Sequence, residues 1–127
     1  MAPPQLLTAS LDLVQETLLG EALDHAPVGA LVLDDEGRYL AANRLACELL
    51  GYTRDELLRV RARALAFEPD EVPSILARIV RGELRSGRGD IKSKDGTALE
   101  IEFRIGETRS GGLPFYVFVF WEPLEAE

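Results

Sequence analysis

The chain has 127 residues, 46% of them apolar and 28% charged, and its formal net charge is −8. This length suits one domain with its own core. A net acidic chain repels a phosphate backbone, and no apolar run approaches the roughly 20 residues needed to span a bilayer. The start of the chain lacks the features of a secretion signal, and a single cysteine cannot form an internal disulfide. We therefore expect a cytoplasmic domain that binds neither nucleic acid nor membrane.

Apolar residues near the N-terminus recur at helical spacing. One stripe consists of Leu7, Leu11, Val14 and Leu18. Their 4-3-4 spacing, with further leucines beside it, predicts an amphipathic helix of about four turns over residues 6–23. We expect the helix to end before the sequence Pro-Val-Gly at residues 27–29.

A hairpin and short capped helices are predicted next. Residues 30–34 and 39–42 are the two strands, joined by a tight turn. Asn43 suits a helix N-cap, and Gly51 suits the C-terminal end of the helix that follows it. Thr53 begins a capping box, with a glutamate three residues later, which predicts a further helical turn.

A longer helix is expected to start at Pro69, because proline is favoured in the first turn of a helix. Its apolar residues again follow the helical period, and Gly82 is a plausible end. The segment 84–89 is predicted to be a loop. Beyond it the period changes to two, which predicts strands at residues 90–94 and 98–106.

The last predicted strand, residues 115–121, is apolar on both faces. Such a strand is expected to lie centrally in its sheet, with both faces covered. The N-terminal helix is the only unassigned apolar surface, so we predict that it packs on the outer face. Strands separated by a run of helices indicate an α+β fold with an antiparallel sheet.

This order of elements, with its turns and caps, resembles the PAS family, and most closely the PAS domains of bacterial sensor kinases. The resemblance rests on residues 26–29, 34–38, 43–46, 50–57, 94–97 and 106–112. It implies a five-stranded antiparallel sheet flanked by short helices. We divide the chain into a dimerisation helix (1–20), a PAS domain (21–122) and a C-terminal tail (123–127). The tail lacks the Asp-Ile-Thr-like exit that is common in the family.

The sequence provides no set of residues for catalysis or for a familiar cofactor. Haem-binding relatives carry their ligand on the helix that here spans residues 69–81, which contains no His, Cys, Met or Tyr. His25 lies instead at the end of the N-terminal helix. Cys47 lacks the Asn-Cys-Arg-Phe-Leu-Gln-like motif of flavin-binding relatives. We expect no catalytic residue, no metal, no haem and no flavin.

The resemblance also implies an interior cavity beneath the helices. Its candidate lining residues are Ile75, Ile79, Ile91, Phe103, Ile105, Tyr116 and Phe118. Phe118 occupies a place where oxygen-sensing relatives tend to keep a small residue, so we expect its ring to fill space that a ligand would use. Two alternatives stay open, a filled hydrophobic core and a site for a small apolar ligand.

The outer face of the last strand pairs with the leucine-rich helix in one of two ways, as a lid within one chain or as the interface of a homodimer. An exposed apolar stripe of this size favours association, and PAS relatives often dimerise through this element. The interface candidates are Leu7, Leu11, Val14, Leu18, Phe115, Val117, Val119 and Trp121. We expect a homodimeric signal-transduction module that relays a signal to an effector domain or a two-component partner such as a histidine kinase. The alternative is a ligand-free interaction domain.

Overall fold

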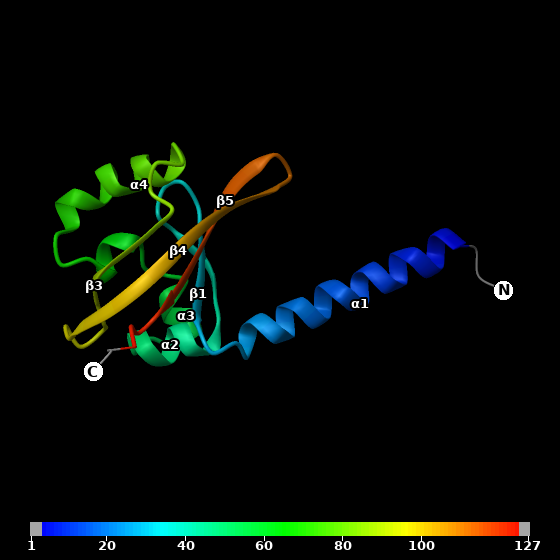
Figure 1. The fold of residues 1–127 in the computed structure, drawn as a ribbon, viewed down its shortest axis with the longest axis horizontal. Helices are drawn as coiled ribbons and strands as arrows, with labels where there is room; N and C mark the ends of the chain where they lie inside the picture. The colour runs from blue at the N-terminus through cyan, green and yellow to red at the C-terminus, as the bar shows by residue number, and fades with distance from the viewer. Residues whose placement is uncertain (1–3, 125–127) are drawn as a thin grey trace.

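The computed structural model describes residues 4–124, with side chains from Leu11 onward. Five antiparallel strands form one sheet in the order β2-β1-β5-β4-β3, with the short helices against one face (Figure 1). In chain order the elements are α1 (Pro4–Asp24), β1 (Gly29–Leu33), β2 (Tyr39–Ala42), α2 (Arg44–Leu50), α3 (Arg54–Leu57), the 3-10 turns η1 (Ala62–Leu65) and η2 (Pro69–Glu71), α4 (Val72–Val80), β3 (Ser86–Lys92), β4 (Ala98–Ser110) and β5 (Leu113–Trp121). The predicted α+β architecture, with β5 at the centre of the sheet, is confirmed.

The predicted caps are present and shape the helical face of the domain. The Asn43 side chain accepts a hydrogen bond from the first turn of α2, and Gly51 ends that helix with φ of 77°. Glycine tolerates this left-handed backbone because it has no Cβ. Thr53 and Glu56 form both hydrogen bonds of the predicted capping box at α3. Local chemistry therefore fixes where these two helices begin.

Two predicted boundaries were wrong. The segment expected to be a loop includes the start of β3, which pairs with β4 from Ser86 opposite Arg104 to Lys92 opposite Ala98. Its first half, Ser-Gly-Arg-Gly-Asp, has poor strand propensity, and pairing with β4 imposes the extended backbone. The helix expected from Pro69 begins as the short turn η2, and α4 itself starts at Val72 with Pro73 in its first turn.

The core lies between the inner face of the sheet and the helices. Its largest fully buried side chains are Leu31, Leu50, Leu57, Ile101 and Phe120. On β5 the alternation is as predicted, with Tyr116 and Phe120 buried on the inner side. The outer residues of this strand are only half-buried.

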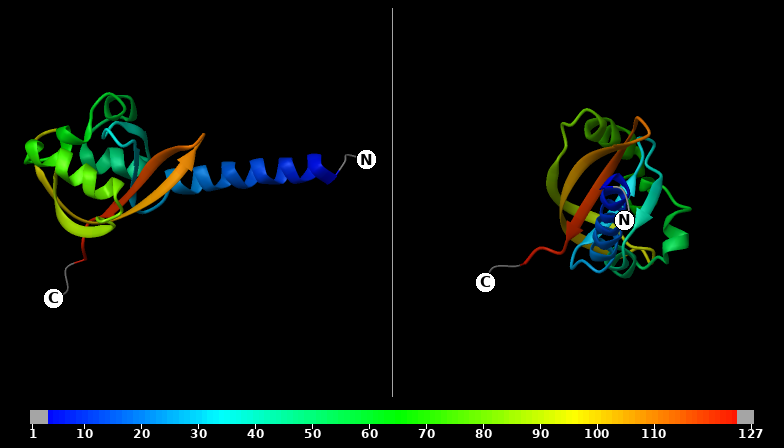
Figure 2. Two further views of the ribbon diagram at one scale, coloured as in Figure 1. Left: turned by 90° about the horizontal axis from the view of Figure 1, so that it is seen from above. Right: turned by 90° about the vertical axis from the view of Figure 1, so that its right-hand side faces the viewer.

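The helix α1 does not cover the outer face of its own sheet, contrary to prediction. Figures 1 and 2 show it extending away from the domain as an arm. Leu11 and Leu18 are each 62% exposed, and the side chain of Leu7 lies outside the part of the chain that the structure describes. The reading of α1 as a lid within one chain is therefore wrong. The base of the helix is held at the domain, and from there its axis leads outward.

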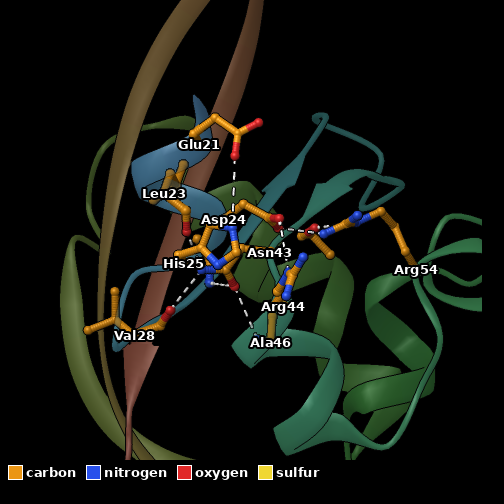
Figure 3. A network of polar contacts seen from close by, with 11 residues as sticks. Glu21, Leu23, Asp24, His25, Val28, Asn43, Arg44, Ala46 and Arg54 are labelled. Atoms are coloured by element: carbon orange, nitrogen blue, oxygen red, sulfur yellow. Dashed lines mark hydrogen bonds and ion pairs between the residues drawn. The ribbon is translucent and has the colours of Figure 1, made fainter. Parts of the chain in front are cut away.

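A single buried amide holds that base (Figure 3). The Asn43 oxygen accepts hydrogen bonds from the backbone N–H groups of Ala30 (2.9 Å) and Ala46 (3.1 Å). Its nitrogen donates to the backbone oxygens of Leu23 (2.7 Å) and Val28 (2.9 Å). All four hydrogen-bonding positions of the amide are thus used. They join the end of α1, the linker, β1 and the start of α2.

Charged side chains surround this amide at the surface. Asp24, the last residue of α1, accepts hydrogen bonds from Arg44 of α2 and Arg54 of α3. The Arg54 Nε also donates to the backbone oxygen of Ala42 at 2.9 Å. Because these groups are partly exposed, each ion pair contributes little alone. Both arginines thus contact the last residue of α1 from the domain and add to the Asn43 hydrogen bonds at the base of the helix.

We expect Asn43→Ala to lower the free energy of unfolding by about 2–4 kcal/mol, because it leaves several backbone groups without partners. Urea denaturation measures the loss. Thr53→Ala removes a more exposed N-cap and should cost about 1 kcal/mol. Equal losses for the two variants would contradict the special role of Asn43.

Candidate functional site

A cavity of about 450 Å³ lies between the inner face of the sheet and the α4 region. Its floor is formed by strand residues such as Leu31 and Ile101, and its roof by α4 and η1. Nearly all of its wall is apolar. Volume and lining are typical of a site for a small organic molecule.

Five of the seven predicted pocket residues line this cavity. They are Ile75, Ile79, Ile91, Phe103 and Phe118. Ile105 and Tyr116 are also buried on the inner face, but they lie in the core outside the cavity wall. Tyr39, which was not among the predicted residues, lines the cavity from the edge strand β2. Its inward direction follows from its pairing with Leu33, a contact that no local pattern announces.

Phe118 does not fill the interior. Its ring stacks on Phe103, with ring centroids 5.1 Å apart and an interplanar angle of 25°, and lies 5.7 Å from the Phe120 ring. The expectation that this ring would occupy the space of a ligand is therefore corrected. The aromatic residues form part of the wall, and the cavity remains beside them.

Two glycines on β3 explain why space remains. Gly87 is paired with Phe103 and Gly89 with Ile101, so both occupy inward positions, because paired residues share a face. A Cβ at Gly87 would lie 2.7 Å from the Phe103 ring, whereas a Cβ at Gly89 would have no neighbour within 4 Å. Phe103 uses the space above the first glycine. The space above the second opens the cavity at the edge of the sheet.

Tyr39 is the only buried polar side chain among the cavity-lining residues of the described part of the chain. Burial raises the pKa of its hydroxyl well above the usual value, so the group stays neutral and can donate a hydrogen bond. No hydrogen bond joins this hydroxyl to another described group. Fully inaccessible side-chain polar atoms in the described residues all have partners, so the hydroxyl keeps access to open space.

The one cysteine and the one histidine, which flavin–thiol chemistry or haem ligation would use, lie outside the cavity. Cys47 is a half-buried residue of α2 outside the cavity wall, and burial raises the pKa of its thiol. His25, at the end of α1, lies 3.8 Å from a Glu21 carboxylate oxygen. Within residues 4–124 no group of three or more His, Cys, Asp or Glu is placed to hold a metal ion. No helix in this part is long and apolar enough to cross a bilayer.

An antiparallel five-stranded sheet with an apolar cavity under short helices defines a class of sensory α+β domain. The family profile described as the PAS fold matches residues 17–124. The chain therefore belongs to the PAS family, whose members are generally sensory, non-catalytic signalling modules. No curated protein is significantly similar to it in sequence.

Solved structures agree with this assignment. The PAS domain of a Desulfitobacterium hafniense protein is 26% identical, with a TM-score of 0.74 over 80% of this chain and 97% of that one. A domain of a sensory box sensor histidine kinase/response regulator from Geobacter sulfurreducens is 28% identical, with a TM-score of 0.69 over 83% and 92%. An RNA-binding light-oxygen-voltage receptor is 25% identical, with a TM-score of 0.70 over 96% of this chain and 35% of that one.

The two β3 glycines should respond oppositely to the same substitution. Gly87→Ala pushes a methyl group into the Phe103 ring and should cost about 1–3 kcal/mol of unfolding free energy. Gly89→Ala should be neutral or stabilising by up to about 1 kcal/mol, because the space is open and alanine restricts the unfolded chain. Chemical denaturation of both variants measures the difference. A destabilising Gly89→Ala would show that the space above this residue is occupied.

Proposed function

We propose that this PAS domain is a homodimeric regulatory module that binds a small apolar ligand in its cavity and relays the change to a partner or effector. The observation that carries the dimer is the exposure of α1. Val14 and Leu18 are 54% and 62% exposed in a helix that is tied to the domain at one end. A second copy of the chain is the occupant that would cover them.

The α1 stripe suits helix-to-helix packing between two copies. Leu11, Val14 and Leu18 follow a three-and-four spacing, which places one narrow seam along a helix. Gln15 and Thr17, beside this seam, are uncharged. Between Leu11 and Leu18, two such seams therefore meet without repulsion between like charges, and Glu21, at the next position of the spacing, ends the apolar seam.

The outer sheet face supplies a second apolar surface for the same interface. On β5 its half-buried residues are Phe115, Val117, Val119 and Trp121. Val32 of β1 extends the patch, since it is paired with Val117. The Trp121 indole donates a hydrogen bond to Glu102 at 3.0 Å, which fixes the ring on this face. Because α1 of the same chain points away from this face, we infer that α1 of a second copy packs on it.

A route from the cavity to the interface runs through the central strands. Phe118 lines the cavity, and its neighbours Val117 and Val119 lie on the opposite face of β5. A ligand can shift dimer packing only if it binds one arrangement more tightly than another. The likeness to the Geobacter kinase domain supports a signalling role of the two-component type.

The same cavity favours an apolar ligand over haem or flavin. Its described wall contains no His, Cys or Met, and the single thiol lies on α2. No imidazole, thiol or thioether of the described wall is thus available for haem ligation or for flavin–thiol chemistry, and burial keeps the phenol of Tyr39, the one tyrosine in the wall, neutral by raising its pKa. Shape and lining suit a compact organic molecule.

The double substitution Leu11→Glu with Leu18→Glu should convert the dimer into a monomer, because four carboxylates would face one another across the seam. Sedimentation velocity measures the change. Leu13→Glu with Leu19→Glu is the matched control, since these residues are 64% and 71% exposed on other sides of α1. A dimer that survives the first pair, or a wild-type monomer, contradicts the proposed interface.

Freshly purified protein should be colourless and should carry one small organic molecule per chain. Native mass spectrometry with a visible absorption spectrum tests this. A haem or flavin band in the visible would contradict the proposed ligand class. A mass that disappears on unfolding identifies a non-covalent ligand.

A further inference from the structure

We propose that the ligand is an uncharged, mostly apolar molecule with one hydrogen-bond-accepting oxygen, that it enters across Gly89 between β3 and α4, and that the Tyr39 hydroxyl anchors its oxygen. This rests on the proposed ligand-binding function and adds the chemistry of the ligand and its route. Three features of the cavity carry it: the gap at β3, the buried hydroxyl and the charges at the rim.

The gap at β3 provides the entrance. Gly89 lines the cavity and has open space where a side chain would stand. Across from it, Ile75 of α4 is 38% exposed and Phe67 is 45% exposed, although both line the cavity. Apolar side chains that stay exposed at the mouth of an apolar cavity gain most when a ligand covers them. The body of the ligand therefore lies between β3 and α4.

The hydroxyl of Tyr39 sets the polar end of the ligand. Tyr39 is only 7% exposed and lines the cavity from β2. The hydroxyl has no partner among the described groups and is not fully enclosed, so a ligand oxygen that accepts its hydrogen bond replaces water there. The rest of the buried lining is apolar, so it offers one polar contact and penalises further polar groups.

The rim selects against negative charge. Glu68 and Glu71 line the mouth together with one basic residue, Arg78, whereas the side chain of Asp90, which alternates with the inward Gly89 and Ile91, lies on the outer face of the sheet. The residues that lie close to these in the sequence form ion pairs with one another, Arg63 with Asp70 and Arg81 with Glu83. These pairs do not include the rim residues. Two carboxylates against one guanidinium give the mouth a net negative charge, which repels an anionic ligand. An uncharged molecule avoids this repulsion and the cost of burying a charge in the apolar wall.

Three compounds of matched shape test the proposal on the full chain: 2-acetylnaphthalene, 2-ethylnaphthalene and 2-naphthoate. Binding is followed by amide NMR titration, which also locates it at Gly89 and Ile91. We expect 2-acetylnaphthalene to bind most tightly and 2-naphthoate at least tenfold more weakly. Tyr39→Phe should weaken 2-acetylnaphthalene three- to tenfold and leave 2-ethylnaphthalene unchanged.

Gly89→Leu should weaken both neutral compounds at least tenfold by filling the entrance. Gly89→Ala, the matched control at the same position, should retain binding. Both variants should keep the amide spectrum of the remaining domain, because a Cβ at Gly89 meets no neighbour and this glycine does not have a positive φ.

Each contrary result overturns a different part of the proposal. Equal affinity for the two neutral compounds, or no effect of Tyr39→Phe, overturns the anchor while an apolar site stands. Tighter binding of 2-naphthoate overturns the uncharged class. Unchanged binding by Gly89→Leu overturns the route. If neither neutral compound shifts the Gly89 and Ile91 amides, the proposed ligand class is overturned, whereas dimerisation is judged separately by sedimentation.

Discussion

The Asn43 amide is the point at which the arm and the domain become one structure. Two backbone N–H groups donate to its oxygen, and its nitrogen donates to two backbone carbonyls, one of them at Leu23 in the last turn of α1. A buried amide with all its partners in place is stable only in one geometry, because moving any partner leaves a polar group without water or protein. The direction of α1, the start of β1 and the start of α2 are therefore set together.

This constraint supports the proposed role of the helix at an interface. Since the base of α1 is fixed and Leu18 stays exposed, the helix carries the orientation of the domain outward to whatever packs on it. The bond from Ala30 to Asn43 places one end of this connection on β1. β1 is paired with β5, which lines the cavity through Phe118. Strand pairing between β5 and β1, followed by the hydrogen bonds of the Asn43 side chain, thus connects the cavity to the arm.

The cavity depends on what the sheet lacks. On β3 the inward positions beside Phe103 and Ile101 are glycines, so the edge of the sheet has less side-chain volume than its centre. The Phe103 ring lies over Gly87 and stacks on Phe118. The space over Gly89 therefore stays open. The same aromatic residues that suggest a filled core in the sequence therefore serve as one wall of a hollow one.

Local chemistry in the sequence determined most of the fold. The caps at Asn43, Gly51 and Thr53, the glycine turns and the alternation along β4 and β5 each act within a few residues, so their signals are readable in one dimension. Tertiary structure alone decided the rest. Strand β3 exists through its pairing with β4, Tyr39 faces the cavity through its pairing with β1, and α1 leaves the domain because distant backbone groups meet at one amide. These outcomes depend on contacts between residues far apart in the chain, which no local pattern encodes.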